Sequence, residues 1–190
     1  MCYIKNHICQ CRQILHGQTA SAGKRRDCHA VPKGKRSCMS NIHSSGHDRV
    51  LHVPEGTEYV GNRYYSGRND FEEVVFPDSV ADIGVGAFAD CTSLVSISLP
   101  AGLTRIRKEL FSGCAALKRI SVPDSVNTIG EWAFRCCSAL EEIELPLSVT
   151  DIAAEAFLSC PRIVITAVPR SYAEKFAMKH DIPFRSTHMA

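Results

Sequence analysis

Cysteine and histidine side chains gather near the N-terminus, where they could bind a metal ion. Thiolate and imidazole are the ligands that zinc prefers in proteins, and the candidate ligands here are Cys9, Cys11, Cys28 and His29. The segment has no C-x-x-C pair, and it is rich in Gly, Ser, Lys and Arg without apolar periodicity. Because such a composition cannot bury enough surface to fold alone, we expect residues 1–47 to be a disordered basic tail. A metal-ordered knuckle and a basic binding arm are the two alternatives.

A second set of cysteines recurs every 23 residues in the rest of the chain: Cys91, Cys114, Cys137 and Cys160. Small buried cysteines behave as hydrophobic residues, so we expect these thiols to form a ladder inside the fold. Parallel side chains that point inward have the wrong geometry for disulfides. Cys136 is adjacent to Cys137 and should point the other way, which would make it the reactive thiol of this region.

The sequence contains no recognisable catalytic motif. It has no G-x-S-x-G elbow, no phosphate-binding loop with its lysine, and no H-E-x-x-H pair. Gly84 and Gly86 lie in a turn that is not followed by the long helix of a nucleotide-binding glycine motif. We therefore expect a protein that is not an enzyme and that has no cofactor.

The elements that must position these residues follow a single period of 23 residues. Prolines keep this step at Pro54, Pro77, Pro100, Pro123, Pro146 and Pro169. Phenylalanines keep it at Phe88, Phe111, Phe134 and Phe157. Isoleucines keep it at Ile83, Ile106, Ile129 and Ile152. Several independent residue types in one register indicate a repeat architecture.

One repeat unit reads L-x-x-I-x-L-P-x-x-[VL]-x-x-I-G-x-x-A-F-x-x-C-x-x, as in residues 117–139. The apolar spacing of residues 94–99 predicts a short strand, and Pro100 ends it because proline cannot donate to a ladder. A second short extended piece follows, and the A-F-x-x-C part has the spacing of a helical or 3₁₀ turn. A single unit cannot bury its apolar side chains alone. Stacked units can, so the pattern predicts a β-rich solenoid of the α/β class.

The two ends of the repeat region depart from the repeat. Residues 50–65 read as an irregular first rung. Near the other end, Ser171 and Glu174 have the spacing of a capping box, which predicts a helix through about Lys179. Repeat stacks need such a cap for solubility, so we expect this helix to close the solenoid.

Charge divides the chain into two parts. Residues 1–47 contain eight Lys or Arg and one Asp, a net charge of +7, which leaves −5 for the remainder. We therefore expect a basic tail at 1–47, a solenoid with its cap at 48–184, and a flexible end at 185–190. No apolar run approaches the ~18 residues of a membrane span, and the opening residues contain no secretory hydrophobic region.

Alternation along the strands places one set of side chains on the outer face of the sheet. This is the face that we expect to contact a protein partner. Its candidate residues are Glu72, Glu73, Ser96, Ser98, Lys118, Arg119, Ser121, Glu141, Glu142 and Glu144.

Charges on this face have a competing structural interpretation. Lys118 should neighbour Glu141 across one rung, and Arg119 should neighbour Glu142. Exposed pairs of this kind contribute only ~0.2–1 kcal/mol, so they are also consistent with a solvated structural surface. The glutamates, with Glu144, would repel phosphate, which argues against a nucleic-acid partner. Outside this face, we expect Trp132 to cover a neighbouring coil, with an exposed anchor as the alternative.

The repeat motif of residues 117–139 resembles the BspA-like, bacterial surface-antigen type of leucine-rich repeat. The resemblance covers about residues 50–182. It implies a right-handed leucine-rich-repeat solenoid, a location at the cell surface or outside the cell, and a role in adhesion or in binding a host or cell-surface protein. The leading hypothesis is thus a non-catalytic protein-binding module that uses the strand face. The alternative is a zinc-binding regulatory or scaffold protein that uses the N-terminal Cys/His tail.

Overall fold

A computed structural model describes residues 49–187 of the chain. The predictions for the tail at 1–47, including the candidate zinc ligands Cys9, Cys11, Cys28 and His29, lie outside the described residues.

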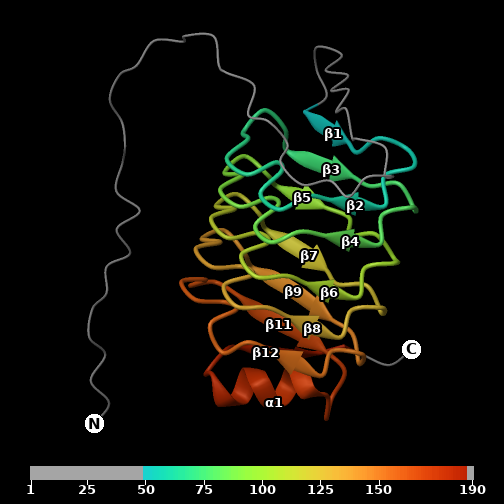
Figure 1. Ribbon diagram of the computed structural model, residues 1–190. Coiled ribbons are helices and arrows are strands. Elements are labelled where there is room, and N and C mark those ends of the chain that lie inside the picture. The colour runs from blue at the N-terminus through green and yellow to red at the C-terminus, as the bar shows by residue number, and fades with distance from the viewer. Residues whose placement is uncertain (1–48, 188–190) are drawn as a thin grey trace, which may run out of the picture. The chain divides into compact units, whose positions relative to one another are not determined.

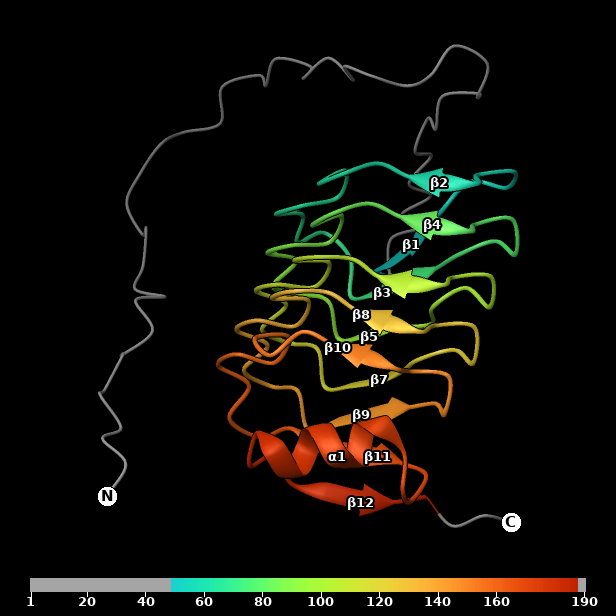
Figure 2. The same cartoon turned by 60° about the horizontal axis from the view of Figure 1, so that its bottom comes forward.

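The described chain winds into a stack of coils, and each coil from β1 to β10 contributes two short strands that pair in parallel with those of neighbouring coils (Figures 1 and 2). The first strands form one column: β1 (Val50–His52), β3 (Glu73–Val75), β5 (Ser96–Ile97), β7 (Arg119–Ser121), β9 (Glu142–Leu145), β11 (Val164–Ala167) and β12 (Phe184–Ser186). The second strands form another: β2 (Tyr59–Val60), β4 (Asp82–Ile83), β6 (Arg105–Ile106), β8 (Thr128–Ile129) and β10 (Asp151–Ile152). This is the β-rich solenoid that the period predicts. A coil is named below by its first strand.

Pairing between first strands follows the repeat period as far as β9, whereas β11 pairs with β9 at an offset of 22 residues. Glu73 pairs with Ser96, and Arg119 pairs with Glu142, each 23 residues further along the chain. Within a strand, burial alternates: Ile120 in β7 is buried, whereas its neighbours Arg119 and Ser121 are exposed. The first strand column therefore has one side in the core and one side in solvent.

The third side of each coil, formed by the A-F-x-x-C segment, consists of hydrogen-bonded turns and not of a continuous helix. One such turn closes where the amide of Ala89 donates to the carbonyl of Gly86 at 3.0 Å. Left-handed residues interrupt these segments, as at Glu109 (φ 59°) and Gly113 (φ 77°). A left-handed residue breaks the helical ladder, so the helical character expected here stops after a turn.

Aromatic side chains stack along the axis of the coils. The ring centroids of Phe88 and Phe111 are 6.0 Å apart, those of Phe111 and Phe134 are 5.5 Å apart, and those of Phe134 and Phe157 are 5.4 Å apart. The three interplanar angles are 20°, 21° and 9°. The column thus forms a continuous core that holds successive coils at one spacing.

The β5 coil departs from its neighbours. Among the described strands, the first column is interrupted between β5 and β7, and the second column between β4 and β6. Arg107 occupies the place of Gly130 in the β7 coil, where an added Cβ would lie 2.7 Å from the amide nitrogen of Lys108. Ala153 occupies the same position in the β9 coil, and its single methyl group still allows its amide to donate to the carbonyl of Ile129 in the preceding coil at 2.9 Å. The longer side chain of Arg107 reaches back to Asp82 instead, at 3.0 and 2.6 Å, and bridges the interruption.

Helix α1 (Tyr172–Lys179) confirms the predicted cap. The Ser171 hydroxyl accepts a hydrogen bond from the amide of Glu174 at 3.2 Å, and Phe176 is buried against the last coils. The chain then turns back, and β12 pairs with β11, with Arg185 opposite Thr166. Ordered pairing therefore extends past the expected boundary at residue 184, because the backbone groups of β11 offer a free edge. None of the helices in the described part of the chain is long and apolar enough to cross a bilayer.

Candidate protein-binding surface on the first strand column

The outer side of the first strand column, here called the strand face, presents the predicted site residues together. Most of these side chains are exposed: Glu72, Glu73, Ser96, Ser98, Lys118, Arg119, Ser121, Glu141 and Glu144. Glu142 differs, because its side chain is only 26% exposed. Parallel pairing sets their order, so each coil contributes one rung of side chains about 4.8 Å from the next.

Glu142 is half-buried because three side chains surround its carboxylate. The Thr166 hydroxyl donates to Oε1 at 2.9 Å, and the Arg185 guanidinium donates to the same oxygen at 3.2 Å. Nε of Arg119 lies 3.8 Å from Oε2. The predicted Arg119–Glu142 neighbour pair is confirmed, whereas Thr166 and Arg185 were not expected. Arg185 carries no periodic signal, since β12 lies outside the 23-residue register, and Thr166 lies in β11, which pairs with β9 at an offset of 22 residues.

Other charges on the strand face have no such partner. Lys118 and Glu141 are neighbours through the backbone, where the Glu141 amide donates to the Lys118 carbonyl at 2.9 Å. Within residues 49–187, no ion pair joins their side chains, and none involves Glu73. These three exposed groups keep their full hydrogen-bonding capacity toward solvent or toward a bound molecule.

The charge pattern of the strand face changes sign along the stack. The β3 coil is acidic at Glu72 and Glu73, and Glu72 pairs with Arg49. The β5 coil presents only the small polar Ser96 and Ser98. The β7 coil is basic and the β9 coil is acidic again. Such alternation selects the orientation of a charged partner more than it adds to affinity.

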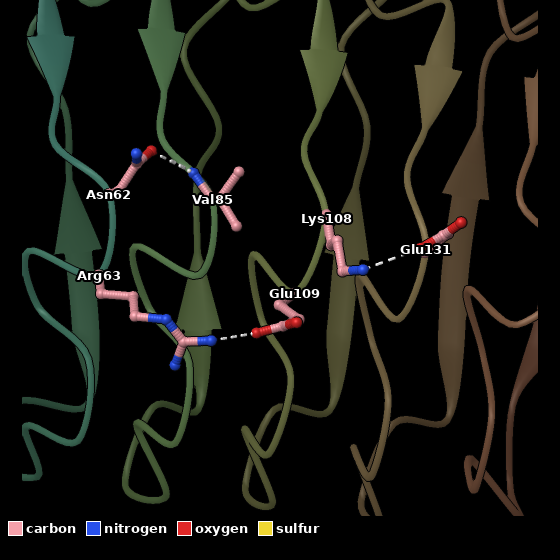
Figure 3. Close-up of polar contacts among 6 residues, drawn as sticks. All are labelled: Asn62, Arg63, Val85, Lys108, Glu109 and Glu131. Atoms are coloured by element: carbon pink, nitrogen blue, oxygen red, sulfur yellow. Dashed lines mark hydrogen bonds and ion pairs between the residues drawn. The ribbon is translucent and has the colours of Figure 1, made fainter.

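Charges between the second strand column and the turns are largely tied to one another. The Arg63 guanidinium donates to Glu109 two coils away, and Lys108 Nζ lies 2.9 Å from Glu131 Oε2 (Figure 3). The side chain of Asn62 accepts from the backbone amide of Val85 at 2.9 Å (Figure 3). These contacts bind coils to one another and engage the charges that form them.

Trp132 belongs to the same system of contacts. Its indole donates to the carboxylate of Glu155 in the next coil. Lys108 Nζ lies 4.4 Å from the ring centroid, a cation–π distance, and the Arg135 guanidinium carbon lies at 5.7 Å. Trp132 is half-buried, and these contacts agree with the expectation that it covers neighbouring coils.

The cysteine ladder is buried and bonded to the backbone. Each thiol donates to the carbonyl of an aromatic residue 26 positions earlier, as from Cys114 to Phe88 at 3.2 Å and from Cys160 to Phe134 at 2.9 Å. Burial raises the pKa of the Cys91 thiol to about 11. Burial likewise raises the pKa of Cys114, whereas a hydrogen bond with Cys137 lowers the pKa of Cys160. All four thiols therefore satisfy core carbonyls, and Cys91 and Cys114 remain protonated at neutral pH.

Cys136 lies apart from this ladder. It is half-buried, and it adopts a left-handed φ of 59° at the position held by Gly113 in the preceding coil. Among residues 49–187, no group of three or more His, Cys, Asp or Glu side chains is arranged to hold a metal ion.

Comparison with known proteins shows which repeat family and which solved structures this chain resembles. Residues 58–175 match six copies of the BspA type leucine rich repeat region. A leucine rich cell surface protein from Faecalibacterium prausnitzii is 31% identical, with a TM-score of 0.64 over 70% of this chain and 35% of that one. The leucine rich repeat protein of T. pallidum is 29% identical, with a TM-score of 0.61 over 72% of this chain and 70% of that one.

A leucine-rich repeat protein from Bacteroides ovatus is 26% identical, with a TM-score of 0.54 over 70% of this chain and 40% of that one. This chain thus spans about a third of the F. prausnitzii protein that it resembles. A search of curated proteins found no match. Because the repeat matches well over half of the chain, the protein belongs to the BspA-type leucine-rich repeat family.

Proposed function

We propose that this protein is a non-catalytic adhesion or recognition module that binds a protein partner through its strand face. One observation carries the proposal: Glu73, Lys118 and Glu141 are exposed on that face without an ion-pair partner in the described part of the chain. Elsewhere on the solenoid, many charges are already engaged by neighbouring coils. The strand face therefore has binding capacity that the fold itself does not use.

The rigidity of this face supports the proposal. Its strands are held by parallel ladders on one side of a core with continuous stacking, so its side chains are positioned before binding. A preorganised surface loses less conformational entropy when a partner binds. A repeat stack also presents its rungs as a long, open surface, which suits a protein better than a small molecule.

Similarity to other proteins supports the proposed location. One similar structure is a cell surface protein of F. prausnitzii, which covers 70% of this chain at 31% identity. We accordingly propose that the partner is encountered at the cell surface, as a host or cell-surface protein.

Capture from an extract would test the proposal. The full chain would be immobilised and exposed to host-cell and bacterial surface extracts, with bound proteins identified by mass spectrometry. The test variant is Lys118→Glu with Glu141→Lys, which exchanges two charges on the strand face and preserves net charge. The matched control is Arg105→Glu with Asp151→Lys, two exposed residues of the second strand column.

We expect the strand-face variant to lose a captured partner by about tenfold or more, because repulsive charge pairs across an interface cost several kcal/mol. The control variant should retain it. Equal capture by the wild type and by both variants would contradict binding at the strand face.

A further inference from the structure

A groove beside the proline turns adjoins the strand face, and its chemistry specifies a kind of partner. We call it the proline groove, and its volume is about 470 Å³. Its lining comes from the coils of β7, β9 and β11 and from the residue after β12: Ser121, Val122, Pro123, Asp124, Glu144, Leu145, Pro146, Leu147, Val168 and Thr187. We propose that this groove binds a partner segment in which a Lys or Arg side chain adjoins a bulky apolar side chain. The inference rests on the proposed function and deepens it.

Leu147 supplies the apolar contact. Its side chain is 62% exposed, although it follows Pro146 at a position where a solvated residue is expected. The equivalent positions after the other repeat prolines hold residues that are charged or small: Glu55, Asp78, Ala101, Asp124 and Arg170. A lone exposed leucine is ordinary on a protein surface. Here, however, Leu147 lies in a concave groove beside Pro146 and the half-buried Val168, where a second apolar side chain would be shielded from water on several sides.

Two carboxylates supply the charge. Asp124 is exposed, and no side chain of residues 49–187 forms an ion pair with it. Glu144 accepts one hydrogen bond from the Ser121 hydroxyl at 3.2 Å, which leaves most of its acceptor capacity open. Asp124 and Glu144 belong to adjacent coils, so a single ammonium or guanidinium group in the groove could contact both.

Asp124 and Leu147 set the orientation of the bound segment. Strands β7 and β9 pair at an offset of 23 residues, so Asp124 and Leu147 hold the same position in adjacent coils, directly after Pro123 and Pro146. A cationic group is attracted to Asp124. The cation of the partner therefore lies toward the β7 coil, and its apolar neighbour lies over Leu147.

The groove is continuous with the strand face. Ser121 and Glu144 line it and also belong to the outward rungs of β7 and β9. A partner that covers the strand face would reach the groove without a gap. Its apolar contact would give the mainly polar strand face the anchor that protein interfaces usually have.

Labelled peptides can test the groove directly. The probes are fluorescein-labelled peptides of sequence GSKLKLSG, GSKSKSSG and GSELELSG, titrated with the full chain at about 0.15 M salt and followed by fluorescence anisotropy. At this ionic strength, diffuse charge attraction between exposed groups is largely screened beyond ~8 Å. We expect GSKLKLSG to bind at least about fivefold more tightly than either of the other peptides, because only it matches both features of the groove.

Variants then locate the binding. Leu147→Ser and the pair Asp124→Asn with Glu144→Gln should each weaken binding of GSKLKLSG about fivefold or more. The matched controls are Asp78→Asn, at the same position after proline two coils earlier, and Asp151→Asn, on the second strand column outside the groove and the strand face. All these residues are exposed, so the substitutions should leave the fold intact, as thermal unfolding would verify.

Two outcomes would overturn the inference. One is equal binding of GSKLKLSG and GSKSKSSG, which would mean that the groove attracts the peptide by charge alone and that Leu147 makes no apolar contact with it. The other is weakening by the control variants as much as by the groove variants. If Leu147→Ser retains the partner captured from extract while Lys118→Glu with Glu141→Lys loses it, the groove inference fails and the proposed strand-face function stands.

Discussion

Replacing Gly102 with serine should stabilise the protein by completing a column of hydrogen bonds that the β5 coil lacks. In three other coils, a serine two residues after the proline donates to the carbonyl 22 residues earlier. The bonds are Ser79 to Thr57 at 2.8 Å, Ser125 to Leu103 at 2.7 Å and Ser148 to Val126 at 2.7 Å. The β5 coil has Gly102 at this position, so the corresponding carbonyl, that of Val80, receives no serine hydroxyl.

The local geometry admits the new side chain. A Cβ built on Gly102 would lie 3.5 Å from the Val80 carbonyl oxygen and 3.9 Å from the Cα of Ala81, both ordinary contacts. Gly102 is not in the left-handed region, so a serine there carries no backbone strain. The hydroxyl of Gly102→Ser should therefore reach the carbonyl as the other serines do.

Two terms add to give the expected magnitude. Removing a glycine at a compatible position lowers the entropy of the unfolded chain and stabilises by ~0.4–1 kcal/mol. A new intramolecular hydrogen bond contributes a further ~0.5–1.5 kcal/mol. Gly102→Ser should thus raise the free energy of unfolding by about 1–2.5 kcal/mol, and Gly102→Ala by only the first of these terms.

Urea unfolding of the full chain, followed by far-UV circular dichroism, would measure both variants. The expected change is a higher midpoint at an unchanged m-value, with a rise in Tm of ~2–4 °C per kcal/mol. In the reverse direction, Ser125→Ala should destabilise by ~1–3 kcal/mol, because it leaves the Leu103 carbonyl without its donor. If Gly102→Ser is no more stable than Gly102→Ala, the serine column does not contribute to stability and the reasoning is wrong.

Four further substitutions or measurements test the core and the thiols. Phe111→Ala, in the middle of the aromatic stack and fully buried, should cost ~3–5 kcal/mol in urea unfolding, and a loss below about 1 kcal/mol would mean that the stack is not a main source of stability. Gly130→Val should lower the free energy of unfolding by ~1–3 kcal/mol in the same assay, because its Cβ would lie 2.7 Å from the backbone nitrogen of Lys108 and the preceding coil must move. If the variant is as stable as the wild type, the coils can move apart at no cost and their close contact at Gly130 does not matter. Iodoacetamide at pH 8, with sites mapped by mass spectrometry, should modify Cys136 well before Cys91, and the opposite order would contradict the assigned burial. The pKa of Cys91 is raised from 9.0 to about 11 in the folded chain, so the unfolded chain loses this proton first as pH rises. The contribution of this thiol to the free energy of unfolding is therefore complete below pH 9 and is lost toward pH 11. In Cys91→Ala, the free energy of unfolding should depend less on pH within that window.

The repeat, its buried columns and the capping helix could be predicted from the sequence. The reason is that a solenoid is nearly one-dimensional: each coil contacts its neighbours in the same register, so a 23-residue period already states which side chains stack. Phe134 and Cys137 are buried for this reason, and Arg119 pairs with Glu142. Ser171 and Glu174 likewise marked the start of α1, since helix caps are local.

What breaks the period was decided by the tertiary structure alone. Arg185 contacts Glu142 across 43 residues because β12 pairs along the edge of β11. The 23-residue period does not predict this last strand. Arg63 reaches Glu109 across 46 residues because the intervening position is Gly86, which carries no side chain to block it. The proline groove and the interrupted β5 coil also depend on how unlike residues meet between coils. A repeated sequence specifies which positions become neighbours, but the side chains at those positions and their rotamers decide which neighbours bond and which remain open to a partner.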